Sequence, residues 1–260
     1  MSAYISNLNL VNVSKSVRSV WLMLIMIFSV TASATDNYGK LDTLSISVVE
    51  AKPWGWNEGH NLQGVLYDLA GLVAQELGVE LDARSGSVAR VILQVSTGES
   101  DFIYFIDHPG LNKVADNVIE LGVKSELQLW QRADSDWSLD KPLQDLRIAT
   151  SIQGAENMPL LANVKVDHVH TADLLVPMLA AGRVDAVLEL STVLEYSRVS
   201  SKKPRHQFNS LAVEQIPSYL WVSKKSKLSA QEIERVGLAV IKVSSPEVFQ
   251  ELIQFYIKDQ

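Results

Sequence analysis

Apolar residues recur along the first half of the chain with two periods, 2 for strands and 3.6 for helices. Residues 44–48 alternate apolar and polar positions, whereas residues 64–77 place apolar side chains on one helical face before Gly78. This half predicts the order β-α-β-α-β, with strands over 44–48, 79–83 and 101–106 and helices over 64–77 and from Ser87 to Gly98. That order is typical of a parallel sheet covered by helices.

A similar succession recurs in the second half of the chain. The predicted elements are strands over 147–150, 164–166 and 185–188, a helix that opens at Gly154, and a helix from Thr171 to Gly182 with Leu174 facing inward. Extended segments at 127–130 and 218–222 flank them, and two helices that begin at Ser229 and Ser245 end the chain.

This chain order predicts two lobes joined by two crossing segments. We expect lobe 1 to comprise residues 35–126 and 223–260, and lobe 2 to comprise residues 127–222. The crossings, near 127–132 and 217–223, are expected to act as a hinge. A cleft between lobes is the usual place for a small ligand.

The first 34 residues are typical of a secretory signal peptide. Lys15 and Arg18 precede an unbroken apolar run over 20–28, and the small residues at 32–34 suit a signal peptidase. A membrane anchor is the alternative, but the run has about half of the roughly 20 apolar residues that span a bilayer. We expect cleavage after Ala34 and a periplasmic protein.

Composition excludes several other classes of protein. The chain has 260 residues, 47% of them hydrophobic, which excludes disorder and leaves room for a large core. It contains no cysteine, which removes disulfides, thiol nucleophiles and thiolate zinc sites. The formal net charge of −7, without a long basic block, argues against nucleic-acid binding.

In this order and spacing, the motifs resemble the family 3 extracellular solute-binding proteins of ABC transporters, the polar-amino-acid type. The resemblance covers about residues 42–257 and implies a two-lobed α/β fold of periplasmic-binding-protein type II, which closes on a solute like a hinge. The matching landmarks are Pro53-Trp54-Gly-Trp56, Gly64-x-x-Tyr67-Asp68-Leu69, Leu77-Gly78-Val79, Arg90, Gly98-x-x-Asp101, Leu146, Gly154 and Ala181-Gly182-Arg183-Val184-Asp185-Ala186-Val187.

In the first lobe, the resemblance implies four ligand-binding positions. The family's stacking aromatics correspond to Trp54 and Trp56, although either ring is equally compatible with packing against its own lobe. The family's carboxylate-binding arginine corresponds to Lys113, which keeps the charge but loses the planar fork, and the expected threonine is Gly110.

In the second lobe, the family's carboxylate site at a helix start corresponds to Gly154 and Ala155, which offer only backbone N–H groups and the helix dipole. The family's amine-binding aspartate is replaced by Leu190. Glu189 lies one place earlier, where an alternating strand would point it to the other face, and is the remaining ligand-binding candidate of this strand. We therefore expect a ligand that carries a carboxylate and need not carry an amine.

Two more candidates come from the residues themselves. Asp107 and His108 follow a buried strand, at the end where ligands bind in open α/β sheets; a turn before Pro109 is the alternative role. His168 and His170 have the spacing of a metal pair but lack a third ligand. We expect no metal and no cofactor.

Together, these features favour a monomeric periplasmic binding protein rather than an enzyme. Its expected partners are a small polar solute, an amino acid or a related compound, and the permease of an ABC transporter. Two alternatives remain open at this point: an enzyme on the same scaffold, similar to cyclohexadienyl dehydratase, and a subunit that senses a ligand for a signalling partner. An enzyme would have Glu189, His108 and Lys113 available as acids and bases.

Overall fold

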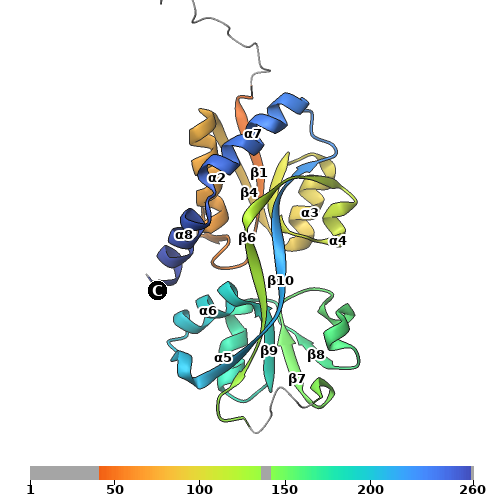
Figure 1. Cartoon of the computed structure of the whole chain (residues 1–260), viewed down its shortest axis with the longest axis vertical. Helices are drawn as coiled ribbons and strands as arrows, with labels where there is room; N and C mark the ends of the chain where they lie inside the picture. The colour runs from red at the N-terminus through yellow and green to blue at the C-terminus, as the bar shows by residue number, and fades with distance from the viewer. Residues whose placement is uncertain (1–40, 136–141, 259–260) are drawn as a thin grey trace, which may run out of the picture. The chain divides into compact units, whose positions relative to one another are not determined.

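The computed structural model describes residues 41–135 and 142–258 (Figure 1). The expected signal peptide lies outside the described residues. The strands are β1 (Thr43–Val49), β2 (Trp56–Glu58), β3 (Asn61–Gln63), β4 (Glu80–Gly86), β5 (Phe102–Ile106), β6 (Ala115–Arg132), β7 (Arg147–Thr150), β8 (Lys165–His168), β9 (Ala186–Leu190) and β10 (Phe208–Ser223). The α-helices are α2 (Val65–Leu77), α3 (Val88–Thr97), α4 (Pro109–Asn112), α5 (Leu175–Ala180), α6 (Ser191–Ser200), α7 (Ala230–Val243) and α8 (Pro246–Lys258). Short 3-10 helices are η1 (Leu143–Asp145), η2 (Ala155–Asn157), η3 (Pro159–Leu161), η4 (Ala172–Leu174) and η5 (Arg205–Gln207).

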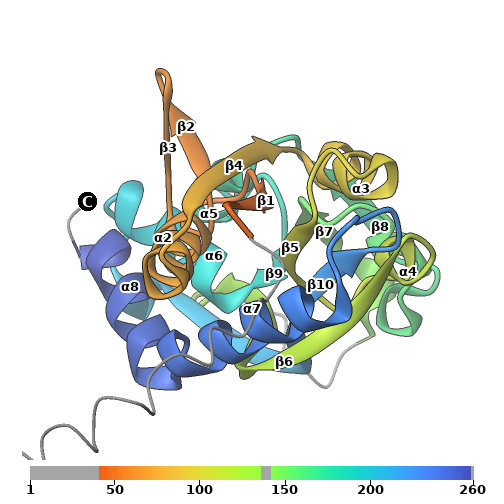
Figure 2. The ribbon, with the colours of Figure 1, turned by 90° about the horizontal axis from the view of Figure 1, so that it is seen from above.

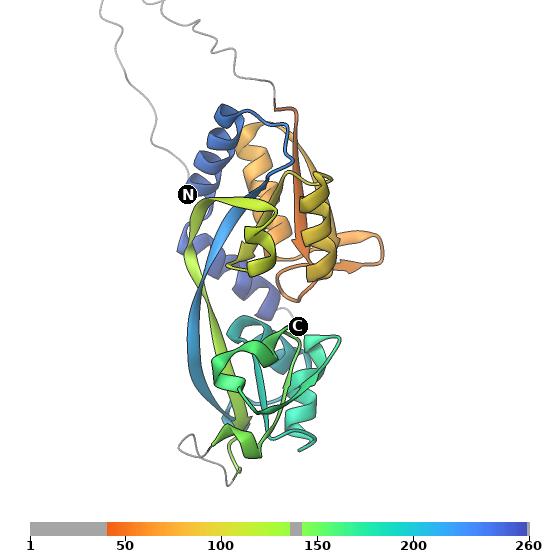
Figure 3. The same cartoon turned by 90° about the vertical axis from the view of Figure 1, so that its right-hand side faces the viewer.

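One eight-stranded sheet joins two parallel groups of strands, in the order β4-β1-β5-β10-β6-β9-β7-β8. β1 pairs in parallel with β4 and β5, and β7 pairs in parallel with β8 and β9. The long strands β6 and β10 are antiparallel to each other and pass from one group to the other (Figures 1 and 3). We refer to β4-β1-β5 with α2, α3, α4, α7 and α8 as the first lobe. We refer to β9-β7-β8 with η1 to η4, α5 and α6 as the second lobe.

The first lobe buries both faces of its strands. On one face, α2 and α7 cover β1 through Leu44, Leu69 and Val236, each at most 1% exposed. On the other face, α3 and α4 pack on β5 through Val91 and Leu111. Figure 2 shows the two sets of helices on opposite sides of the strands. The expected α/β class is confirmed.

The second lobe also has a core on each face of its strands. Val187 packs with α5 and α6 on one face, whereas Leu188 packs with Leu161 and the 3-10 turns on the other. Because successive residues of β9 point to opposite faces, an apolar strand of this kind needs cover on both sides.

The predicted ends of the first-lobe helices are confirmed. Gly78 and Gly98 follow α2 and α3 with φ of 68° and 76°, a left-handed conformation that glycine adopts without steric cost. The Oγ of Ser87 accepts the N–H of Arg90 at 3.4 Å and so caps α3.

In the second lobe, the helix predicted from Gly154 is wrong, and the helix predicted from Thr171 is correct except for its start. Gly154 opens only the three-residue turn η2, because Met158 precedes Pro159 and adopts an extended conformation that ends the turn. The side chain of Thr171 accepts no capping hydrogen bond, a 3-10 turn follows it, and α5 begins only at Leu175. Leu174 is 50% exposed as a result, rather than facing inward.

Only a short part of β6 and β10 connects the two lobes, because each of these strands also pairs with a strand of one lobe. In β10, Ser218–Val222 pair with β5, and in β6, Leu127–Gln131 pair with β9. Between these pairings, Lys124 to Glu126 face only Gln215 to Pro217 of the partner crossing strand. The lobe boundaries and the hinge remain predictions, and this pairing favours residues 124–126 and 215–217 as the hinge.

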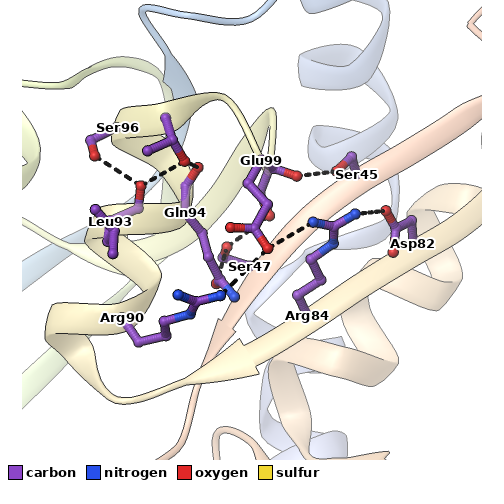
Figure 4. Close-up of polar contacts among 11 residues, drawn as sticks. Ser45, Ser47, Asp82, Arg84, Arg90, Leu93, Gln94, Ser96 and Glu99 are labelled. Carbon is purple, nitrogen blue, oxygen red and sulfur yellow. Dashed lines mark hydrogen bonds and ion pairs between the residues drawn. The ribbon is translucent and has the colours of Figure 1, made fainter.

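A polar network fixes α3 onto β1 and β4 (Figure 4). The Oγ of Ser47, which is 1% exposed, lies 2.9 Å from Gln94 Oε1 and 2.9 Å from Ser100 Oγ. At the edge of the network, Arg84 bridges Asp82 and Glu99, each at 3.0 Å. The inner hydrogen bonds contribute more than these ion pairs, because exposed ion pairs are worth little.

We expect Ser47→Ala to lower the free energy of unfolding by about 1–3 kcal/mol, because it leaves the buried polar atoms of Gln94 and Ser100 without their partner. Denaturant unfolding monitored by circular dichroism measures this change in the free energy of unfolding. The control is Ser96→Ala, whose hydroxyl donates to the Leu93 carbonyl of its own helix, with an expected change within about 0.5 kcal/mol. Equal losses in both variants would contradict a stabilising network.

Candidate binding cavity

A cavity of about 210 Å³ lies where the two lobes meet. The carboxyl ends of four parallel strands reach it: Val49 of β1, Ile106 of β5, Ser151 directly after β7 and Leu190 of β9. Ligands of open α/β sheets bind beyond this end of the strands. The crossing strands close another side of the cavity with residues that include Ser125 and Ser218.

Most of the cavity wall is apolar. Aliphatic side chains from both lobes line it, and Trp54, Tyr104 and Phe105 add aromatic surface from the first lobe. A site of this composition binds mainly by removing apolar surface from water, and its few polar groups fix the orientation of the ligand.

Glu189 is the one carboxyl group among the residues that line the cavity. It is 4% exposed, and its Oε1 accepts the N–H of Leu190 at 3.0 Å while its Oε2 accepts a hydrogen bond from Ser151 Oγ. Within the described residues no cation pairs with it, and burial raises the pKa of the Glu189 carboxyl despite these hydrogen bonds. The sequence predicted this residue for the site, and the structure places it in the cavity wall.

The raised pKa predicts how Glu189 affects stability with pH. Between its ordinary value of 4.5 and the higher pKa of the folded state, the folded protein binds more protons than the unfolded chain, so stability falls as pH rises. Glu189→Gln cannot ionise, so its stability should not fall in this pH range on account of this residue. We expect the melting temperature of the variant, relative to wild type, to rise from pH 4.5 upward and to level off above the folded-state pKa. A difference that is constant with pH would contradict the assignment.

His108 contributes a neutral ring to the cavity. Its Nδ1 accepts the N–H of Gly110 at 3.0 Å, and its ring packs edge-on against Phe105 with centroids 5.7 Å apart. Burial lowers the pKa of the His108 imidazole, and protonation of Nδ1 would remove the acceptor for Gly110. No hydrogen bond joins His108 to Glu189 in the described structure.

Two aromatic residues of the wall carry unsatisfied polar atoms. The hydroxyl of Tyr104 and the Nε1 of Trp54 are buried without a hydrogen-bond partner among the described residues. Burial also raises the pKa of the Tyr104 hydroxyl, so this group stays protonated. Because an unpaired buried polar group is costly, a polar group of a bound solute that reached either atom would form a favourable hydrogen bond.

Trp56 lies outside the cavity wall, in an aromatic cluster at the edge of the two lobes. Its ring contacts Tyr256 of α8 edge-on at 5.2 Å between centroids and Tyr196 of α6 at 6.1 Å. Lys52 lies 6.0 Å from the Trp56 ring centroid and pairs with Asp173 of the second lobe at 3.5 Å. Of the two tryptophans expected at the ligand, Trp54 lines the cavity and Trp56 links the lobes beside it.

Four other predicted residues are not in the cavity wall. Lys113 is exposed at the end of α4, and Asp107 is exposed and accepts a hydrogen bond from Asn112 at 3.3 Å. Gly154 precedes and Ala155 begins the three-residue turn η2, which is too short to provide the expected helix dipole. The geometry therefore gives no support to a carboxylate held between Lys113 and this turn.

Sequence reasoning missed most of the polar wall. Tyr104, Ser125, Ser151, Gln153 and Ser218 line the cavity but belong to no motif. The position of Ser151 was a usable signal. Ser151 directly follows a predicted parallel strand, as Asp107 and His108 do, and ligands of open α/β sheets bind beyond that end of the strands.

The described residues contain no group of His, Asp and Glu that would hold a metal ion, and His168 instead pairs with Glu156 at 3.0 Å. Among the same described residues, no helix is long and apolar enough to cross a membrane.

No protein-family model and no curated protein matches the chain. Solved structures do match it. The periplasmic VFT2 domain of BvgS from Bordetella pertussis is 16% identical, with a TM-score of 0.64 over 82% of this chain and 93% of that chain. The amino acid ABC transporter substrate-binding protein AbpA from Streptococcus pneumoniae, bound to L-arginine, is 20% identical, with a TM-score of 0.63 over 83% and 94%. The ancestral amino-acid-binding protein AncCDT-1, a precursor of cyclohexadienyl dehydratase, is 18% identical, with a TM-score of 0.64 over 83% and 95%.

At these identities the similarity shows the fold. The chain has the two-lobed α/β fold of amino-acid ABC transporter substrate-binding proteins, as the sequence resemblance implied.

Proposed function

We propose that this chain is a solute-binding protein that takes a small solute into the cavity between its lobes and delivers it to an ABC transporter. The observation that carries the proposal is the cavity itself, which lies at the carboxyl ends of β1, β5, β7 and β9 and draws its wall from both lobes. The amino-acid ABC transporter binding proteins with the same fold support it.

A thermal-shift screen tests the proposal. Amines, amino acids, organic acids and neutral apolar solutes are added to the purified protein, and hits are confirmed by calorimetric titration. A ligand at 100 times its Kd should stabilise the fold by about 2.7 kcal/mol. If no solute of the four classes binds, the proposal is wrong. If chromatography shows that the protein consumes a solute it binds, an enzyme is favoured instead.

Export through residues 1–34 is part of the same proposal. A cleaved signal peptide predicts that protein recovered from the periplasm begins at Thr35. N-terminal sequencing measures this directly. Full-length chain retained in the membrane fraction would contradict it and favour an anchor.

A further inference from the structure

The charges around the cavity are unbalanced. Of the residues that line it, Tyr104, His108 and Glu189 are titratable, and none is Lys or Arg. His108 is held as a hydrogen-bond acceptor, and burial lowers the pKa of its ring, so it supplies no positive charge at neutral pH. The wall therefore contains one potential negative charge and no compensating cation.

We infer that the cavity takes a small organic amine, an ammonium group on an apolar body without a carboxylate, and that Glu189 is its counterion. This inference rests on the proposed function and specifies its solute class. It replaces the carboxylate-bearing ligand that the position of Lys113 suggested.

Glu189 is arranged to accept such a group. A carboxylate has about four lone-pair sites; Leu190 N–H and Ser151 Oγ use two of them, and the backbone of Ser151 also hydrogen-bonds to the group. An isolated buried carboxylate is costly, and pairing with a cation together with hydrogen bonds offsets that cost. An ammonium ion supplies both the missing charge and further N–H donors.

The rest of the wall suits the other parts of an amine. Trp54, Tyr104 and Phe105 line the cavity, and aromatic rings attract cations; the aliphatic wall accommodates an apolar body. The volume of about 210 Å³ is below the roughly 300–1,000 Å³ of sites for drug-sized ligands, which favours a small molecule.

The same wall disfavours a carboxylate on the ligand. A buried carboxylate would meet no Lys or Arg of the wall and would be repelled by Glu189. Lys52 is not among the residues that line the cavity, and its ammonium pairs with Asp173 at 3.5 Å. An α-amino acid would therefore bind more weakly than the amine with the same side chain.

Matched sets of probes test the inference. Butylamine, cyclohexylamine and 2-phenylethylamine are each compared by calorimetric titration with the amino acid and the alcohol of nearest shape. We expect at least one amine to bind about tenfold or more tightly than both counterparts, a difference of about 1.4 kcal/mol. In Glu189→Gln, this preference for the amine over the alcohol should disappear.

The control variant is Glu120→Gln, which changes the net charge equally at an exposed position of β6 and should retain the preference. Circular dichroism of both variants verifies that they fold; if Glu189→Gln does not, Ser151→Ala, which removes one hydrogen bond to Glu189, should weaken the amine selectively. Equal binding of amine and amino acid, amine binding unchanged in a folded Glu189→Gln, or no binding by any amine would overturn the inference. If a solute of another class binds, the proposed function stands and the amine inference fails. If no solute of any class binds, the proposed function and the amine inference both fail.

Discussion

Trp221→Ala is expected to lower the free energy of unfolding by about 3–5 kcal/mol, the cost of truncating a large buried aromatic residue. Trp221 is 2% exposed and lies in β10 between Ile103 of β5 and Asn117 of β6. Its Nε1 donates to the carbonyl of Phe105 at 3.2 Å, and its ring packs edge-on against Tyr219. Truncation removes these contacts and leaves a cavity where α3 packs on the sheet.

Chemical denaturation of wild type and variant measures the loss. The matched control is Phe255→Ala, because this aromatic residue is 58% exposed on α8, and its removal should change the free energy by no more than about 0.5 kcal/mol. Similar costs at the two positions would show that the crossing strand is not part of the core as described.

The fold was predictable because it depends on periodic patterns. Val187 and Leu188 belong to opposite cores of the second lobe, and an apolar run bounded by Gly182 is sufficient to predict such a buried strand. The prediction failed where a local interaction outweighed the pattern. Gly154 resembles a helix start, but Pro159, five residues later, limits the helix to a single turn.

The cavity was predictable only in part, because its wall depends on how strand ends meet in space. Trp54 and Trp56 lie two residues apart, in a turn and at the start of β2, and the packing of Tyr196 and Tyr256 around Trp56 distinguishes them. Lys113 was assigned from its spacing in the family, but the end of α4 exposes it. Neighbouring residues of a strand point to opposite faces, so Glu189 and Leu190 would not be expected to line the same cavity. Both do so because β9 ends at Leu190, and the alternation of side chains ends with the strand.

Ser218→Trp is expected to weaken solute binding by about 100-fold or more, a loss of about 2.8 kcal/mol. Ser218 lines the cavity from β10, where the strand returns to the first lobe beside Ile106. An indole at this position occupies the volume that the solute needs, and overpacking of this kind costs about 1–3 kcal/mol of stability without abolishing the fold.

Calorimetric titration of the hit from the solute screen measures the effect. Ser210→Trp adds the same ring to an exposed position on the same strand and should leave the Kd unchanged. If Ser218→Trp does not fold, Ser218→Leu should give a smaller loss in the same direction. Unaltered affinity in a folded Ser218→Trp would place the solute elsewhere.

The most direct test of the central claim is a distance between the two lobes, measured with and without solute. Since the chain has no cysteine, Glu234→Cys on α7 and Lys165→Cys on β8 introduce one spin-label site in each lobe, both at exposed positions. Electron spin resonance then reports the distribution of distances between the labels. If the lobes close on the solute, saturating ligand shifts this distribution to a single narrower population. An identical distribution with the site saturated, as verified by calorimetry, would contradict capture of a solute by lobe closure.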